Sequence, residues 1–370
     1  MFIIKEILNL SSLKIDMMKY NKINKELFVR NRSLFSAKMK QKSLAVFCSN
    51  DIMPTSADGT MPFRQDSDIL WMSGVDQEES RLIVFPGASA SEYKEVLFLK
   101  ETSELIAVWE GAKLTKEEAF EVSGIKTVYW IDQFESVFEQ LMQEAEIVYL
   151  NSNEHARATV NVETRTARFN KWCKKKYSSH QYEKSAPFMH ELRAVKDSLE
   201  IDLMQHACNI TEKGFRRVLN FVKPGVMEYE IEAEYIHEFL INRSKGFAYE
   251  PIIASGLNAC VLHYIDNNKE CKSGDMVLMD VGAEYANYAS DMTRCIPVSG
   301  RFNDRQKDVY NAVLRVMKAA TEMLQAGVML GDYHKEVGLI MQSELVGLKL
   351  ISQHEIDKQD IKNPVYKKYF

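Results

Sequence analysis

The sequence has few cysteines and lacks the marks of secreted and membrane proteins. Its six cysteines never occur as C-x-x-C, and they lie far apart in apolar or mixed surroundings, which is typical of reduced thiols. Near the amino terminus, Lys5 and Glu6 interrupt the apolar residues, and no small-residue cleavage site follows, so we predict neither a signal peptide nor a membrane span. We therefore expect a cytoplasmic protein.

The sequence also lacks an excess of one charge sign and the motifs of several enzyme classes. Its 47 basic and 52 acidic side chains give a net charge of −5, with both signs scattered, so we expect no nucleic-acid partner and no anionic membrane partner. H-E-x-x-H, G-x-S-x-G, G-x-x-x-x-G-K-[ST] and G-x-G-x-x-G are all absent. Nothing in the sequence therefore supports a zincin, an α/β-hydrolase, a P-loop enzyme or a dinucleotide-binding protein.

What is present is enough apolar sequence for two domains, because 46% of the 370 residues are hydrophobic and 27% are charged. The first half alternates β-rich runs with a helical segment. The β-rich runs are Leu44–Cys48, Leu82–Phe85, Val96–Leu99 and Ile147–Leu150, and the helical segment is Gln133–Gln143. This alternation predicts an α/β domain. A helical stretch from about Val160 to Lys176 then leads to the polar segment Tyr177–Lys184, which we interpret as a boundary region.

The second half has the periodicity of longer helices. Apolar residues recur every three or four positions from Ser198 until Lys223-Pro224-Gly225 ends the pattern. Further helices are predicted from Glu228 to about Asn242 and from after Asn303, an N-cap with Gln306 three residues later, to near Gly327. A β-rich stretch, Ile252–Val298, lies between these two helices.

Two aspartates flank a connection short enough for a hairpin. Asp280 follows Val277-Leu278-Met279, Asp291 precedes Met292-Thr293-Arg294, and Asn287 between them tolerates the positive φ of a tight turn. A turn centred on Ala286-Asn287 places Asp280 opposite Thr293 and diagonal to Asp291. A turn centred on Tyr285-Ala286 places Asp280 directly opposite Asp291. In both registers the carboxylates share one face of the sheet, roughly 5 to 8 Å apart.

Such a pair of carboxylates favours a metal ion. The two groups repel each other, and Asp280 is poorly hydrated within its apolar run, so one must protonate or a cation must lie between them. Hard oxygen ligands favour manganese, magnesium or a similar ion, and Thr293 on the same face is placed to hold a ligand oxygen. The alternative is that Asp280 caps a turn and Asp291 pairs with Arg294 at the surface. The spacing alone does not decide between these interpretations, and two ligands are too few for tight binding.

Two further residues are candidates for contact with a substrate, and each also has a purely structural interpretation. His263 follows Ser255-Gly256-Leu257-Asn258 in an irregular stretch shortly before the aspartates, where an imidazole is able to contact a substrate or a transition state. The alternative is a structural or solvent-exposed histidine. Trp109, in Val108-Trp109-Glu110-Gly111, is able to line a pocket, although a lone tryptophan more often belongs to a core or an interface.

Several blocks occur together in an order and spacing that are specific to one family. They are Met61–Asp68 with Leu70–Gly74, His190–Lys196, Val261–Tyr264, Gly274–Tyr285 and Tyr288–Arg294. On these blocks, the chain from about Lys19 onward resembles the Xaa-Pro aminopeptidases (aminopeptidase P) of the pita-bread metallopeptidase family.

The resemblance implies a fold of α/β and α+β parts. It implies an aminopeptidase P N-terminal domain at 19–180 and a partial pita-bread catalytic domain at 186–370. Residues 1–18 are expected to be a non-native or disordered leader, because Met17 and Met18 directly precede a polar, helix-like stretch. The implied activity is that of a metalloaminopeptidase, which releases the N-terminal residue from peptides with proline in second position. Two divalent ions, commonly Mn²⁺, activate a hydroxide in that reaction. Members are often dimers or tetramers, so a homo-oligomer is expected.

The resemblance also implies roles for individual residues. Asp280 would chelate one ion and Asp291 would bridge both. His263 would steady the bound peptide and the tetrahedral intermediate. Trp109 matches a position near the substrate pocket, contributed across a subunit contact.

The sequence departs from the family pattern at its end. Family members continue past the position of Phe370 into a histidine-rich segment and two strands that supply the remaining metal ligands. We therefore expect an incomplete pita-bread domain with uncovered strand edges and apolar surface, weak metal binding and little or no peptidase activity. Two alternatives remain. One is a prolidase, the dipeptidase of the same fold. The other is a non-catalytic pita-bread module that binds peptides or proteins, against which the retention of both aspartates argues.

Overall fold

The structure is a computed structural model that describes residues 19–360 and 362–369. The expected leader at 1–18 lies outside the described residues. The chain forms two compact units. The N-terminal unit contains the residues up to Ile210 with Phe239–Ala248 and Ala283–Ser290, and the C-terminal unit contains Thr211–Glu238, Tyr249–Gly282 and Asp291–Phe370.

A six-stranded mixed sheet forms the centre of the N-terminal unit, with the order β6-β5-β4-β1-β7-β8. Its strands are β1 (Ser43–Cys48), β4 (Arg81–Val84), β5 (Glu95–Leu99), β6 (Thr127–Trp130), β7 (Ile147–Leu150) and β8 (Gln181–Lys184). The four predicted β-rich runs are confirmed, each within one residue at either end. β1 runs parallel to β7 and antiparallel to β4.

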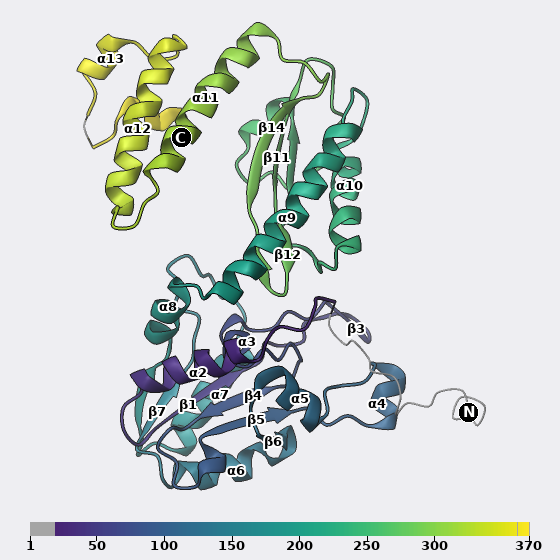
Figure 1. Ribbon diagram of the computed structural model, residues 1–370, viewed down its shortest axis with the longest axis vertical. Helices are drawn as coiled ribbons and strands as arrows, with labels where there is room; N and C mark the ends of the chain where they lie inside the picture. Colours follow the sequence, from purple (N-terminus) through teal and green to yellow (C-terminus); the bar gives the residue numbers. More distant parts are fainter. Residues whose placement is uncertain (1–18, 361, 370) are drawn as a thin grey trace, which may run out of the picture. The chain divides into compact units, whose positions relative to one another are not determined.

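Helices cover both faces of this sheet (Figure 1). One face packs against α6 (Phe134–Met142) and α7 (Arg165–Lys176). The other packs against α2 (Glu26–Lys38), α3 (Ser67–Ser73), α5 (Lys116–Ser123) and α8 (Ala186–Ala194). Alternate residues of a strand point to opposite faces, so Val46 joins the first layer and Phe47 the second. The predicted α/β class is confirmed for this unit.

Smaller elements complete the N-terminal unit. They are the strands β2 (Pro54–Ser56) and β3 (Gly59–Thr60), the helix α4 (Glu104–Trp109), and a small sheet of β9 (Gly246–Phe247), β12 (Ala283–Tyr285) and β13 (Tyr288–Ala289).

Two local predictions differ from the structure. The polar segment Tyr177–Lys184, predicted as a boundary region, ends in the edge strand β8, which pairs parallel with β7. Its side chains are exposed or half-buried, so it lacks the apolar alternation that identifies a strand. The helix α7 begins at Arg165 rather than near Val160, because the Thr164 side chain caps it by accepting a hydrogen bond from the Ala167 amide.

The C-terminal unit contains a three-stranded antiparallel sheet with the order β10-β11-β14. The strands are β10 (Ile252–Ser255), β11 (Met276–Val281) and β14 (Met292–Pro297), and the helices are α11 (Asp304–Met323), α12 (Leu330–Gly347) and α13 (Gln353–Asp357). The predicted capping box of Asn303 and Gln306 is present at the start of α11. The long helices α9 (Ser198–Phe221) and α10 (Glu228–Ile241) confirm the predicted helices that begin at Ser198 and Glu228, and each belongs partly to both units.

The C-terminal unit exposes apolar surface next to an edge strand. Its described sheet ends at β14, and a groove of about 560 Å³ is lined by residues of β11, β14 and α11. Val313, in this groove, is 61% exposed. The sequence predicted uncovered apolar surface, and this groove is such a surface.

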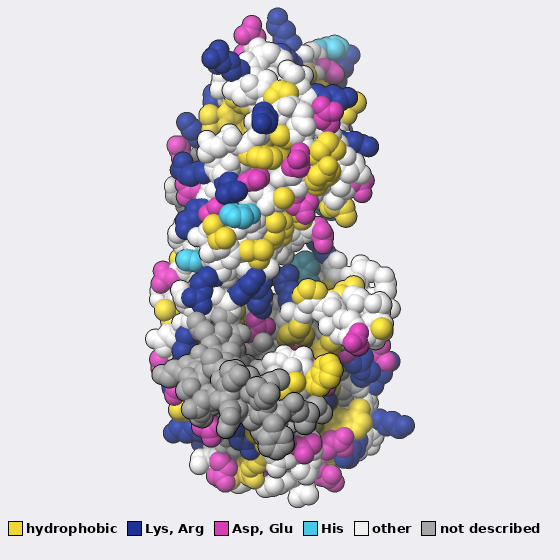
Figure 2. Space-filling model, turned by 90° about the vertical axis from the view of Figure 1, so that its right-hand side faces the viewer, with side chains coloured by type: hydrophobic (Ala, Val, Ile, Leu, Met, Phe, Trp, Pro, Cys, Tyr) yellow, Lys and Arg dark blue, Asp and Glu magenta, His cyan; other side chains and the backbone are white. Residues whose placement is uncertain are grey.

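The described surface has no single dominant charge on the face drawn in Figure 2, where acidic and basic side chains alternate with apolar ones. All six cysteines are free. In the part of the chain that the structure describes, no helix is both long enough and apolar enough to cross a membrane.

Candidate metal centre

The tip of the hairpin between the two aspartates is a two-residue turn. Ala286 and Asn287 have φ values of 53° and 64°, and Tyr285 pairs with Tyr288 across them. Two consecutive positive φ angles define the type I′ turn, whose twist matches that of the flanking strands. The sequence left two turn centres open, and the structure has the one at Ala286-Asn287.

This turn corresponds to the register in which Asp280 lies opposite Thr293 in the β11–β14 pair. Asp291, which directly precedes β14, is therefore the diagonal neighbour of Asp280. On the other side of β11, Asp280 pairs with Ile252 of β10. Half-buried and buried residues alternate along β11, and Asp280 is on its half-buried face. Asp280 thus projects from the central strand of the sheet, while Asp291 is exposed beside it.

The hydroxyl of Tyr249 joins the two carboxylates. It lies 2.7 Å from Asp280 Oδ1 and 3.1 Å from Asp291 Oδ1. These two distances place the carboxylate oxygens within about 6 Å of each other. A phenol carries one proton, so it donates fully to only one acceptor at a time. Two negative charges therefore share a single donor at this point.

Tyr249 stays protonated in this surrounding. Burial raises the pKa of the Tyr249 hydroxyl, and the hydrogen bond and charge of Asp280 and the charge of Asp291 raise it further. Sequence reasoning missed this residue. It lies 31 positions before Asp280, in the connection between β9 and β10, where no periodicity or motif marks it.

The donor set fits a hard divalent cation. Carboxylate oxygens of Asp280 and Asp291 reach a common point, and the exposed Thr293 is opposite Asp280 on the neighbouring strand. Within residues 19–360 and 362–369, no group of three or more His, Cys, Asp or Glu side chains is arranged to hold a metal. The pair of carboxylates therefore stands without a third ligand of these types in the described chain.

The alternative interpretation of the two aspartates does not match the geometry. Asp280 lies inside β11, so it does not cap a turn. Arg294 donates to the backbone carbonyl of Thr293, and among the described residues it forms no ion pair with Asp291. Neither carboxylate is thus explained by a local surface role.

His263 lies in an exposed turn that follows the short helix η3 (Gly256–Cys260). Among the described residues, no hydrogen bond joins its ring to Asp280 or Asp291. The structure therefore places His263 in the same unit as the aspartates, with its side chain open to solvent.

A buried carboxylate holds the segment that carries His263. Glu228, the first residue of α10, is fully buried. It accepts hydrogen bonds from the Ser255 amide and hydroxyl, both at 2.7 Å, from the Tyr264 hydroxyl at 2.7 Å and from the Lys269 amide at 3.0 Å. Burial alone would raise the pKa of Glu228, but these hydrogen bonds outweigh it and lower the pKa below its usual value.

Trp109 ends α4 in the N-terminal unit, and its side chain is 81% exposed. The neighbouring Val108 is 78% exposed. The indole is therefore not part of the core, and it is available to a ligand or to another protein surface.

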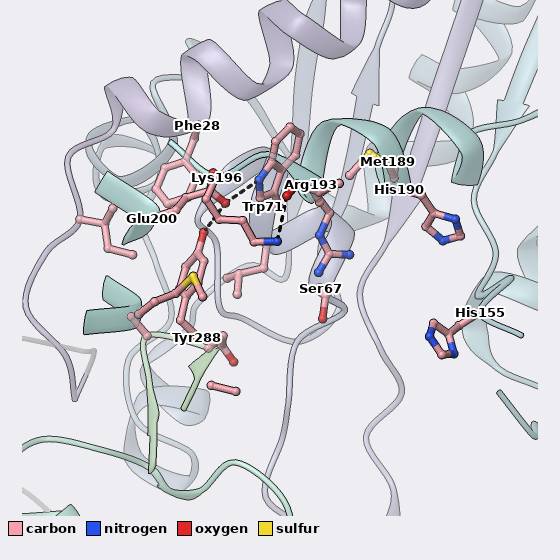
Figure 3. Close-up of a pocket in the computed structure, with 17 residues that line it drawn as sticks. Phe28, Ser67, Trp71, His155, Met189, His190, Arg193, Lys196, Glu200 and Tyr288 are labelled. Atoms are coloured by element: carbon pink, nitrogen blue, oxygen red, sulfur yellow. Dashed lines mark hydrogen bonds between the residues drawn. The ribbon is translucent and has the colours of Figure 1, made fainter. Parts of the chain in front are cut away.

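The N-terminal unit contains a cavity of about 640 Å³ whose lining includes the carboxylate of Glu200 (Figure 3). Glu200 accepts hydrogen bonds from Trp71 Nε1 at 3.0 Å and from the Tyr288 hydroxyl at 2.9 Å. Figure 3 draws His155, His190 and Arg193 in the same cavity. The Asp197 amide also donates to the Glu200 carboxylate, at 2.8 Å. Because three donors satisfy this carboxylate, it serves to hold α3, α9 and β13 together within this unit.

Comparison with known families identifies two consecutive matches. Residues 28–149 match the aminopeptidase P N-terminal domain, and residues 202–364 match metallopeptidase family M24. Among curated proteins, the chain is 31% identical over 333 residues to the Xaa-Pro aminopeptidase of Haemophilus influenzae, covering 89% of this chain and 74% of that protein. It is 30% identical over 332 residues to the Xaa-Pro aminopeptidase of Escherichia coli K12, covering 90% and 75%.

Solved structures of aminopeptidase P are also similar to this chain. Zn-substituted E. coli aminopeptidase P in complex with product has a TM-score of 0.80 and 28% identity, covering 94% of this chain and 78% of that one. The aminopeptidase PepP of Pseudomonas aeruginosa has a TM-score of 0.80 and 27% identity, covering 90% and 75%.

Proposed function

Because the chain belongs to the Xaa-Pro aminopeptidase (aminopeptidase P) family, we propose that Asp280 and Asp291 hold divalent ions in its peptidase site. The enzyme is a metallopeptidase of the class that removes the N-terminal residue of a peptide ahead of proline. The observation that carries the proposed site is the convergence of both carboxylates on the Tyr249 hydroxyl.

The residues have distinct tasks in this proposal. Asp280 supplies an oxygen ligand from the rigid central strand, and Asp291 supplies another from its diagonal position. Tyr249 orients both carboxylates, and Thr293 is placed to hold a ligand oxygen. When bound, the divalent ions supply the Lewis acidity that makes water a nucleophile at neutral pH. The hard oxygen donors support Mn²⁺ as the ion, and the resemblance to the family implies two ions per site.

His263 and Trp109 act on the substrate in this proposal. The exposed imidazole of His263 contacts the bound peptide and steadies the tetrahedral intermediate. The exposed indole of Trp109 contacts the substrate of another subunit in a homo-oligomer. We assign the N-terminal domain to 19–180 and the pita-bread domain to 186–370. The six free cysteines support a cytoplasmic location.

Binding of Mn²⁺ tests the site directly, because it reports on the two carboxylates whatever the rate of peptide hydrolysis. We would titrate the 370-residue chain with Mn²⁺ and measure free ion by electron paramagnetic resonance. Asp280→Asn and Asp291→Asn should each weaken binding by about tenfold or more, because each removes an anionic ligand.

The matched control is Asp266→Asn, which removes the same charge from an exposed loop of the same unit. It should leave the Mn²⁺ affinity unchanged. Equal affinities in all four proteins would show that the ion binds elsewhere, and the proposed site would then be abandoned.

A further inference from the structure

A second cavity of the N-terminal unit has an unusual set of charges. Its volume is about 330 Å³, and it is lined by residues of β4, α6 and α7. The lining consists of three arginines, one glutamate and two aromatic residues, namely Arg81, Arg165, Arg168, Glu135, Phe169 and Trp172. Nothing in the peptidase site described above uses these residues.

Arg81 carries its charge without an ion pair among the described residues. Its guanidinium lies 4.2 Å from the centre of the Phe134 ring and 5.4 Å from that of Phe169. Its Nε is buried with no hydrogen-bond partner, and its side chain forms no ion pair in the part of the chain that the structure describes. Burial lowers the pKa of Arg81, and the charge of Arg165 contributes to the lowering, whereas the charge of Glu135 opposes it. The aromatic rings thus compensate only part of the lost hydration.

The guanidinium of Arg165 likewise lacks an ion pair in the described part of the chain. Arg165 is the first residue of α7, and among the described residues its Nε is also buried without a partner. Arg168, by contrast, pairs with Asp51. The carboxylate of Glu135 is exposed and lies 3.9 Å from Lys176. The cavity therefore holds two neighbouring guanidinium groups that form no ion pair among the described residues, and Glu135 is the one acidic residue in its lining.

We propose that this cavity binds a phosphate group. A guanidinium presents parallel N–H donors that match two oxygens of a phosphate, and two guanidiniums that repel each other are stabilised by one dianion between them. The positive dipole at the amino terminus of the 12-residue helix α7 lies beside Arg165, although the Arg165 amide itself already donates to Asp51. Phe169 and Trp172 give the cavity an apolar wall, against which an organic part of the ligand is able to stack.

The phosphate has two sources with the same chemistry, free inorganic phosphate and a small organic phosphate monoester. The partly buried Trp172 distinguishes them, because only a monoester has a group that stacks on its ring. In either case the ligand binds the folded N-terminal unit and stabilises it by mass action.

Calorimetric titration of the 370-residue chain with inorganic phosphate tests the proposal, at an ionic strength held constant with sodium chloride. Arg165→Gln should weaken phosphate binding by about tenfold or more, because one charge-assisted bidentate contact is lost. Arg81→Gln should weaken it similarly. Arg165 is the safer variant for folding, because it is only half-buried at a helix start, and its thermal unfolding without phosphate should match that of the wild-type protein.

The matched control is Arg157→Gln, which removes an exposed arginine that forms no ion pair among the described residues and lies outside the cavity. It should leave phosphate affinity unchanged. Phenyl phosphate then separates the sources. If it binds more tightly than inorganic phosphate, and Trp172→Leu removes the difference, the ligand is an organic phosphate, whereas equal affinities indicate free phosphate. If neither ligand binds, or if Arg157→Gln weakens binding as much as Arg165→Gln, the proposal is wrong.

Discussion

The carboxylate of Glu228 lies 2.7 Å from the hydroxyl of Tyr264, the residue that directly follows His263. The same carboxylate accepts hydrogen bonds from Ser255 at the end of β10 and from the Lys269 amide. One buried anion therefore fastens both ends of the segment that carries His263. The position of this segment depends on a helix residue that is distant in sequence.

Glu228→Gln should destabilise the chain by about 2 kcal/mol, because it removes the charge from several charge-assisted hydrogen bonds and presents an amide donor to buried donors. Equilibrium unfolding in urea measures the loss. Glu270→Gln is the control, since Glu270 is exposed and loses the same charge. A surface change of this kind should shift the free energy of unfolding by less than about 0.5 kcal/mol. Equal stability of the two variants would contradict a structural role for Glu228.

The contribution of Glu228 should also depend on pH. Its pKa in the folded protein is lowered from the ordinary value of 4.5. Stability from this group is therefore fully present above pH 4.5 and is lost as the pH falls through the lowered folded-state pKa. The difference in unfolding free energy between the wild-type protein and Glu228→Gln should be constant near neutral pH and shrink in acid. If this difference in unfolding free energy grew as the pH fell, the pKa of Glu228 would be raised in the folded protein, contrary to the prediction.

Tyr249→Phe should destabilise the metal-free protein by about 1 kcal/mol, because both carboxylates lose their shared donor. A bound cation neutralises the same two carboxylates, so saturating Mn²⁺ should reduce the loss. Thermal unfolding with a chelator and with Mn²⁺ measures both effects. The control is Tyr229→Phe, which removes a hydroxyl from an exposed side chain of α10. It should leave the thermal stability unchanged both with the chelator and with Mn²⁺. If Mn²⁺ left the loss of stability in Tyr249→Phe unaltered, Tyr249 would not belong to the metal centre.

The sequence predicted the elements around the site better than their connections. The apolar run before Asp280 and the positive-φ tolerance of Asn287 were local signals, and they correspond to the strand β11 and to the turn at Ala286-Asn287. The register was not decided by sequence, because adjacent turn centres both kept the carboxylates on one face. The pairing of Asp280 with Thr293 follows from the turn at Ala286-Asn287, a choice of one residue that local propensities do not make.

The site also contains residues from elements that are distant in sequence, and their contribution could not be predicted from local signals. Tyr249 and Glu228 reach the site only because β10 pairs with β11 and α10 packs at the end of β10. No motif or periodicity in a single sequence encodes such contacts. The edge strand β8 was missed for a different reason, since its polar side chains carry no apolar alternation.

The strength of metal binding follows from the number of ligands. Asp280 and Asp291 converge, but in residues 19–360 and 362–369 no third His, Cys, Asp or Glu joins them. Two carboxylates leave most of the coordination shell of a divalent ion to water, so the ion exchanges readily. After the 370-residue chain is loaded with Mn²⁺ and dialysed against metal-free buffer, elemental analysis should find much less than one ion per chain. Two ions retained per chain would mean that further ligands complete the site.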